Sequence, residues 1–424
     1  MQQNKTAQLL ISGGDERLAL NTQGVNKYGC RPTPDDEVLA FSSSTATPIS
    51  SSRFSMADNL RMRFEQENFS VAIHEQEITR QKSAWRELIG LDNETPLIFS
   101  PSGTDLHRLV SNSVNDNTLI IMPESNETGS GVAAALAQER GVNIVAFSLR
   151  FANGLPRPIS DIDNEVTSLI EKGISENRDI LLIIVDQSKT GMIAPSSHCA
   201  ITLKNTFEKH LTVLVDACQF RLSATTLNAY SKQNFIVALT GSKFLTAPSF
   251  SAMLILPPTI KFSAELEKPN FGLLLRMEIA LQEYRAFSFL TAAQIQLVIL
   301  TFAEAVQTYL KKSPHFDLLE VPDLNRDGLV QNSDWDDLPT IFPFFLLRHQ
   351  KPLSPVETFA VYQKLPQQNP RCQIGQPVFC GNEKSALRLC LSAPLIVNAA
   401  QSEAHLDDCI EKALRVLKTI ETVK

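Results

Sequence analysis

The middle of this chain alternates short apolar runs with stretches of helical periodicity, and this alternation restricts the fold more than any other feature. Such a pattern is typical of a mostly parallel sheet with crossover helices. Seven strands are predicted, at residues 97–100, 118–122, 142–148, 180–186, 212–216, 235–240 and 251–256. Only about ten residues separate the last two strands, too few for a helical crossover, so we expect them to be antiparallel. The sequence predicts an α/β fold with a seven-stranded, mostly parallel sheet.

The two flanks of this central region have different patterns. Residues 1–60 are rich in Gly, Pro and Ser and predict an irregular N-terminal arm, with too little periodic apolar surface to fold alone. The C-terminal part has shorter strands and helices, which predict a smaller α+β domain. We therefore divide the chain into an arm at 1–60, a large domain at 61–290 and a small domain at 291–424.

Composition narrows the class of protein. The chain has 424 residues, 43% of them hydrophobic, and a net charge of −7, which gives no electrostatic reason to expect nucleic acid or a membrane surface as a partner. Its seven cysteines show no CxxC pairing, so neither a zinc site nor a disulfide framework is indicated. No signal peptide and no long apolar span are visible. We expect a soluble, cytoplasmic protein.

An acid and a lysine follow two neighbouring predicted strands. One strand ends at Asp216, and the next is followed by Lys243. Since the carboxyl ends of parallel strands meet at the ligand-binding edge of an open α/β sheet, the two side chains should lie together. A Lys that forms a Schiff base and an Asp that pairs with a pyridinium nitrogen are the groups that pyridoxal 5'-phosphate requires. Gln219 is placed to hydrogen-bond the hydroxyl of the same ring. Taken singly, each residue would more often be a cap or a surface side chain.

A second polar run predicts a phosphate site. Ser102, Gly103 and Thr104 follow the first strand and begin a helix, whose N-terminus presents free N–H groups and a positive dipole end. Gly103 lets the backbone approach a ligand closely. Thr240 and Ser242, beside the lysine, would add donors. The alternative is an ordinary helix cap.

In their order along the chain, these motifs resemble those of the fold-type I pyridoxal-phosphate enzymes, specifically the class V aminotransferase and cysteine desulfurase group. The resemblance covers roughly residues 97–395 and includes the phosphate loop at 102–104, the segment 185–191 with Ser188 near the hydroxyl face of the cofactor, Asp-Ala-x-Gln at 216–219, Ser/Thr-x-x-Lys at 240–243, and 386–389 with Arg388. It implies a small amino-acid or amine substrate and a homodimer with active sites at a two-fold interface.

The resemblance also suggests residues on the substrate side, and it has one gap. Arg388 would grip a substrate carboxylate with a bidentate geometry that Lys cannot reproduce. Tyr28 and Arg53 are further candidates, because the arm of this family often reaches the active site. The family usually stacks a His or aromatic ring on the cofactor shortly after the second strand, whereas residues 123–128 contain no ring.

Three functions are compatible with these residues. The first prediction is aminotransfer, in which Lys243 acts as base and acid at the α-carbon of the substrate. The second is a cysteine desulfurase or C–S/β-lyase, for which Cys372, sixteen residues before Arg388, would be the nucleophile, with its pKa lowered by Arg371. The same segment equally predicts a strand with a buried cysteine, which we favour. The third is a relative that binds the cofactor without turnover.

Residues 323–334 partly match a twelve-residue calcium loop, with acids at positions one, five and twelve. Pro322 precedes the stretch, and Asp334 replaces the bidentate Glu of such loops. A polar turn is the preferred interpretation, and no metal is expected.

Overall fold

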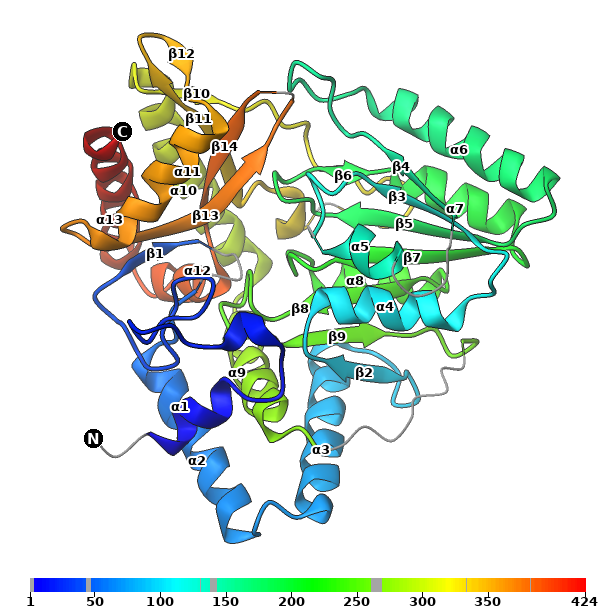
Figure 1. Ribbon diagram of the computed structural model, residues 1–424, viewed down its shortest axis with the longest axis horizontal. Helices are drawn as coiled ribbons and strands as arrows, with labels where there is room; N and C mark the ends of the chain where they lie inside the picture. The colour runs from blue at the N-terminus through cyan, green and yellow to red at the C-terminus, as the bar shows by residue number, and fades with distance from the viewer. Residues whose placement is uncertain are drawn as a thin grey trace.

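The computed structural model describes residues 4–42, 47–129, 131–137, 143–260, 269–332, 334–381 and 383–424. The larger of its two β-sheets has the strand order β2-β9-β8-β7-β5-β3-β4 (Figure 1). Its strands are β2 (Leu97–Ser100), β3 (Leu119–Pro123), β4 (Asn143–Phe147), β5 (Ile180–Asp186), β7 (Leu211–Ala217), β8 (Ile236–Thr240) and β9 (Ala252–Ile255), and the short β6 (Ile193–Ala194) pairs with β5. Strand β9 is antiparallel to β2 and β8, and the other pairs along this order are parallel. All seven predicted strands, and the antiparallel last step, are confirmed.

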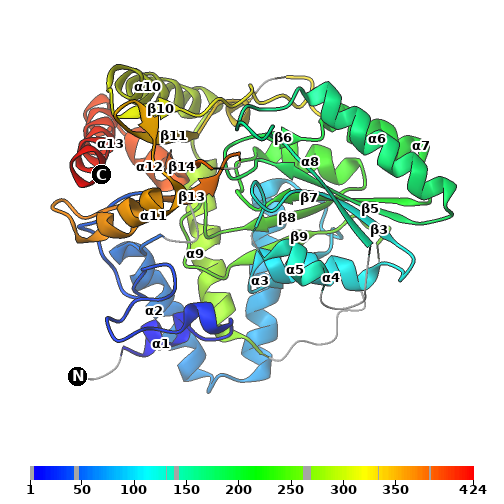
Figure 2. The same cartoon turned by 45° about the horizontal axis from the view of Figure 1, so that its top comes forward.

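Helices cover both faces of this sheet, which is why its central strands are apolar throughout. All seven residues of β5 are buried. Leu182 and Ile184 pack into the core on one face, and Leu181 and Ile183 into a separate core on the other. Figure 2 shows the two layers: α4 (Gly103–Ser113) and α5 (Val132–Ala137) lie on one side, with α6 (Ile159–Ser175), α7 (Ser197–Thr206) and α8 (Ala224–Lys232) on the other.

The second sheet has the order β1-β13-β14-β11-β10, with β12 paired to β11. Its strands are β1 (Leu39–Phe41), β10 (Phe316–Leu318), β11 (Ile341–Arg348), β12 (Lys351–Pro352), β13 (Cys372–Phe379) and β14 (Ser385–Cys390). The helices α11 (Pro355–Lys364), α12 (Ala393–Ala399) and α13 (Glu403–Val423) lie with it. The small α+β unit predicted for the C-terminal part therefore also recruits a strand from the N-terminal part.

Two long helices, α9 (Phe271–Ser288) and α10 (Ala292–Lys312), lead from the first sheet to the second. Nearly every residue of α9 up to Tyr284 is buried. Within the described ranges, no single helix is long and apolar enough to span a membrane. The helices α9 and α10 reach that length and hydropathy only when taken together, and the chain bends by 97° between them.

The N-terminal region is more ordered than the predicted irregular arm. It contains α1 (Lys5–Leu10), a short turn of 3-10 helix at Glu16–Leu18, strand β1, and α2 (Ser51–Gln66), which is followed by α3 (Val71–Ile89). Its order comes from distant partners. Strand β1 pairs in parallel with β13, and buried Arg276 of α9 donates hydrogen bonds to the carbonyl oxygens of Leu10 and Ser12. Local periodicity could not reveal such contacts.

The calcium-loop-like stretch provides a buried arginine. Arg326 forms two hydrogen bonds to Asp186 at the end of β5, at 2.7 and 2.8 Å, and Tyr230 donates a third to the same carboxylate at 2.8 Å. Both charged side chains are fully buried. Across the part of the chain that the structure describes, no group of three or more His, Cys, Asp or Glu residues could hold a metal ion. Arg326 therefore connects the segment between β10 and β11 to the end of β5 in the large sheet.

Candidate active site

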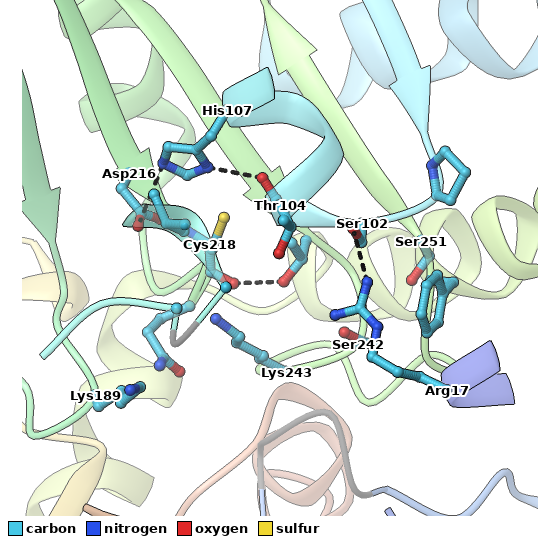
Figure 3. Close-up of a pocket in the computed structure, with 18 of the residues that line it drawn as sticks. Arg17, Ser102, Thr104, His107, Lys189, Asp216, Cys218, Ser242, Lys243 and Ser251 are labelled. Atoms are coloured by element: carbon cyan, nitrogen blue, oxygen red, sulfur yellow. Dashed lines mark hydrogen bonds and ion pairs between the residues drawn. The ribbon is translucent and has the colours of Figure 1, made fainter. Parts of the chain in front are cut away.

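A cavity of about 170 Å³ lies at the carboxyl ends of β7 and β8, at the N-terminus of α4 (Figure 3). It brings together ten residues that the sequence singled out: Tyr28, Ser102, Gly103, Thr104, Asp216, Gln219, Thr240, Ser242, Lys243 and Arg388. Its lining also includes Arg17, His107, Lys189, Cys218 and Gln376. The predicted proximity of Asp216 and Lys243 arises from the pairing of β7 with β8, in which Asp216 lies opposite Ala238.

Asp216 is held as a carboxylate. Burial raises its pKa, but the charges of His107 and Lys243 and the N–H of Cys218 outweigh burial, so its pKa lies below the usual value. The Cys218 N–H donates to Oδ1 at 3.1 Å, and the His107 Nε2 lies 3.6 Å from Oδ2. An ionised acid in a buried position attracts a protonated ring nitrogen.

His107 was missed by the sequence reasoning. It lies one turn after Gly103 in α4, and its Nδ1 donates to the Gly103 carbonyl oxygen at 2.7 Å. Its Nε2 points toward Asp216 without a hydrogen-bond partner within the described chain. The available signal was the four-residue spacing from Gly103, which puts both residues on the same face of the helix.

The other end of the cavity carries hydrogen-bond donors. The first turn of α4 leaves backbone N–H groups without partners inside the helix. The Ser102 hydroxyl is committed to Asp105, and that of Thr240 donates to the Cys218 carbonyl at 2.6 Å. The donors best placed for an anion are therefore the backbone of this turn and the Thr104 and Ser242 hydroxyls.

Arg17 adds a positive charge at this end, and no sequence pattern indicated it. Its Nη2 lies 3.5 Å from the Ser102 hydroxyl, and its guanidinium stacks over Phe250 at 4.7 Å. Asp15 accepts hydrogen bonds from it at 2.6 to 2.9 Å. Beside it lies Tyr28, whose pKa is raised by burial. The N-terminal region thus contributes Arg17 and Tyr28 to the lining of the cavity.

Two observations show that a cofactor of the predicted kind fits these residues. Oε1 of buried Gln219 has no hydrogen-bond partner within the described residues, although this side chain lines the cavity. A Cβ at position 103 would lie 2.9 Å from the Cys218 Sγ, so glycine is required where the helix approaches the strand ends. A ring with a hydroxyl and a phosphate would use both ends of the cavity.

Arg388 lies on β14, 4% exposed, and its guanidinium is fixed by carbonyl oxygens. Its Nε and Nη2 donate to the Gln376 oxygen at 3.0 and 2.9 Å, and its Nη1 donates to the Lys189 oxygen at 3.1 Å. Three of its five N–H groups are used, which leaves two for a ligand.

Lys189 follows β5 and was not a predicted site residue. Burial lowers its pKa to about 8, and the nearby charges of Arg388 and Lys243 contribute in the same direction. Its Nζ donates a hydrogen bond to the Ser125 carbonyl oxygen at 2.9 Å. In Figure 3 it lies at the end of the cavity away from Ser102.

The structure places two predicted site residues elsewhere. Arg53, on α2, forms a two-point ion pair with Glu283 of α9 at 2.7 and 3.1 Å. The Ser188 hydroxyl donates to buried Glu127 at 2.8 Å. Neither contributes to the cavity lining that the described residues form. The long side chain of Arg53 pairs with an acid on a helix far along the chain, so it does not reach this cavity.

All seven cysteines are buried and unpaired. Cys372 begins β13, is 0% exposed, and lies outside the cavity lining formed by the described residues. Burial raises its pKa, whereas a nucleophilic thiol needs a lowered one. Arg371, the expected activator, pairs with Asp35 instead. The geometry favours the structural interpretation of this cysteine.

We expect Cys372→Ser to leave turnover of any substrate within about twofold while lowering stability, because a hydroxyl replaces a buried thiol. Steady-state kinetics and thermal unfolding of both proteins would measure this. A persulfide trapped on Cys372, or loss of sulfide release at unchanged stability, would show that the thiol reacts.

No family model and no curated sequence matches the chain. Solved structures do match. A complex of the cystine C–S lyase C-DES with its reaction product cysteine persulfide superposes with a TM-score of 0.58 at 16% identity, over 89% of this chain and 97% of that one. The chain has the fold of fold-type I pyridoxal-phosphate enzymes.

Two further structures with this fold are similar over nearly the whole chain. A NifS-like protein from Rickettsia africae has a TM-score of 0.57 at 12% identity, covering 90% of this chain and 99% of its own. The cysteine desulfurase CsdA from Escherichia coli has a TM-score of 0.56 at 15% identity, covering 90% and 95%. The predicted fold class is confirmed.

Proposed function

We propose that this chain is a pyridoxal 5'-phosphate-dependent enzyme that acts on an amino acid. The observation that carries the proposal is the convergence of Lys243 and ionised Asp216 in one cavity, at the strand ends where the fold binds ligands. When bound, the cofactor supplies an electron sink for a carbanion at the substrate's α-carbon.

Each end of the cavity has a separate task in this proposal. Asp216 would hold a proton on the ring nitrogen, with its carboxylate fixed by the Cys218 N–H and lying beside His107. The first turn of α4, Thr104, Ser242 and Arg17 hold the phosphate. Lys243 supplies the amine that retains the cofactor and then moves a proton at the α-carbon, as a general base and acid.

Two reactions begin with this proton transfer. Aminotransfer is the first candidate, because it needs only the acid, the lysine and a carboxylate clamp such as Arg388. Cleavage of a C–S bond is the second, and the similarity to the cystine C–S lyase C-DES and the cysteine desulfurase CsdA favours it. A desulfurase that uses Cys372 has no support in the geometry. A lyase that needs no protein thiol agrees with the buried cysteines.

The decisive experiment is an absorbance spectrum of the purified chain after incubation with pyridoxal phosphate and removal of excess cofactor. We expect a yellow protein whose visible band changes when a substrate amino acid is added. Assays of keto acid and of sulfide release then separate aminotransfer from C–S cleavage. A protein that stays colourless would refute the proposal, and one that binds cofactor but changes with no amino acid would favour a non-catalytic relative.

We also propose that the working unit is a homodimer. Exposed apolar side chains support it, including Phe289 after α9 at 80% and Leu297 and Leu300 of α10 at 63% and 53% exposure. Leu297 and Leu300 are three residues apart and therefore share a helix face, which a second copy would cover. Sedimentation should give twice the chain mass of 47.0 kDa. A monomer with full activity would contradict this.

A further inference from the structure

Lys189 and Arg388 lie at the same end of the cavity and are in direct contact. The Lys189 carbonyl oxygen accepts a hydrogen bond from Arg388 Nη1 at 3.1 Å, and both residues line the cavity. The Lys189 ammonium has three N–H donors and uses one of them, toward the Ser125 oxygen. Two donors therefore remain for a ligand.

Neither of these cations forms an ion pair with a carboxylate in the part of the chain that the structure describes. The nearby acids have other partners. Glu127 pairs with Arg150 at 2.8 Å and accepts hydrogen bonds from Ser188 and Thr190, and Asp216 lies beside His107. Two cations that are largely buried side by side oppose one another, unless an anion enters between them.

The cofactor phosphate and the substrate α-carboxylate are the two anionic groups expected in the cavity, and they do not account for all of its cationic side chains. The cofactor phosphate belongs at the opposite end, with Arg17 and the first turn of α4. The α-carboxylate of an amino acid takes the two free N–H groups of Arg388. Lys189 then has no ligand group, although it lines the cavity next to Arg388.

We propose that Lys189 is a specificity-determining residue, which binds a second carboxylate, so that the enzyme selects amino acids with an acidic side chain. This inference rests on the proposed function. The lysine is chemically suited to the task, because a compact ammonium with two free donors binds a carboxylate whose position varies with side-chain length.

The test compares wild type with Lys189→Met, which keeps the length of the side chain and removes its charge. Both proteins are loaded with cofactor, and kcat/KM is measured for aspartate and glutamate against their amides asparagine and glutamine. We expect wild type to prefer the acids, and the substitution to lower kcat/KM for the better acid about 100-fold. Values for the amides should change by less than about threefold.

A second readout does not depend on turnover. Maleate, a dicarboxylate, should raise the Tm of wild type with and without cofactor, because a ligand that binds only the folded state stabilises it. Maleamate, which has one carboxylate replaced by an amide, should raise it much less. In the Lys189→Met protein the two ligands should have equal effects.

The preference for acids should also decline as the pH rises past about 8, where Lys189 loses its proton. The charged groups that face it are Arg388 of β14, Lys243 after β8, Glu127 after β3 and Asp216 of β7. Below this pH Lys189 is protonated and attracts an anion. Above it Lys189 is neutral and no longer does so.

Several outcomes would overturn the inference. One is an equal kcat/KM of the wild type for acids and amides. Another is an equal loss of kcat/KM for both kinds of substrate in the Lys189→Met protein, because Lys189 would then bind the α-carboxylate. If no amino acid is turned over, equal Tm shifts by maleate and maleamate in wild type decide against it. Failure of the proposed function is distinguishable, because it would appear as absence of cofactor uptake in wild type and variant alike.

Discussion

Lys243→Ala should abolish covalent attachment of pyridoxal phosphate and lower turnover by at least about 10⁴-fold, because one side chain both retains the cofactor and moves the proton at the α-carbon. After borohydride treatment, mass spectrometry of the wild type should find the cofactor on the peptide that contains residue 243. The variant peptide should carry none, and the protein should lose its visible band.

Lys232→Ala, at the exposed end of α8, is the matched control. It removes a lysine from the same α/β unit without altering the cavity, so cofactor attachment and turnover should equal those of wild type. Unchanged attachment in the Lys243→Ala protein would mean that a different amine carries the cofactor. Lys189, in the same cavity, would then be the first to examine.

Asp216→Asn should leave the cofactor attached but slow α-proton removal by about 10³-fold, which corresponds to about 4 kcal/mol of transition-state free energy. Asparagine retains an oxygen for the Cys218 N–H, which donates to Asp216 at 3.1 Å, so the local turn should persist. It lacks the negative charge that holds a proton on the ring nitrogen. The exchange of the substrate's α-proton in deuterated water, followed by NMR, measures the step directly.

Two comparisons separate this chemical effect from damage to the fold. The thermal midpoint and the cofactor content of the Asp216→Asn protein should be close to those of wild type. Asp317→Asn, on the edge strand β10 far along the chain, should leave α-proton exchange unaltered. Exchange at the wild-type rate in the Asp216→Asn protein would make Asp216 a structural cap.

The large sheet could be predicted from the sequence because its strands are short apolar runs in regular alternation with helices. Asp216 and Lys243 could be placed together for the same reason, since neighbouring parallel strands fix the positions of their carboxyl ends. The loop that we propose for the phosphate could be singled out by local chemistry, a serine cap followed by a glycine at the start of α4. Each of these inferences required only local pattern and one rule of sheet geometry.

The remaining residues depend on contacts between distant parts of the chain. Arg17 reaches the cavity because α1 and the turn after it pack on α9. No pattern in residues 4–18 predicts that Arg17 lies there. Lys189 becomes a site residue only when β14 brings Arg388 against its carbonyl oxygen. Arg53, by contrast, was a candidate from the sequence, and its side chain pairs with Glu283. Long cationic side chains are hard to place because their partner, and not their position in the sequence, decides where they point.

The N-terminal segment that carries Arg17 and Tyr28 is anchored at both ends. Before Arg17, Arg276 of α9 holds the backbone at Leu10 and Ser12, and after Tyr28, β1 is paired with β13 of the second sheet. This segment therefore spans from α9 to the second sheet and lines the cavity with Arg17 and Tyr28. Movement of α9 relative to the second sheet would displace these two side chains, so we expect the residence time of a bound molecule to depend on that movement as well as on the contacts that the molecule makes.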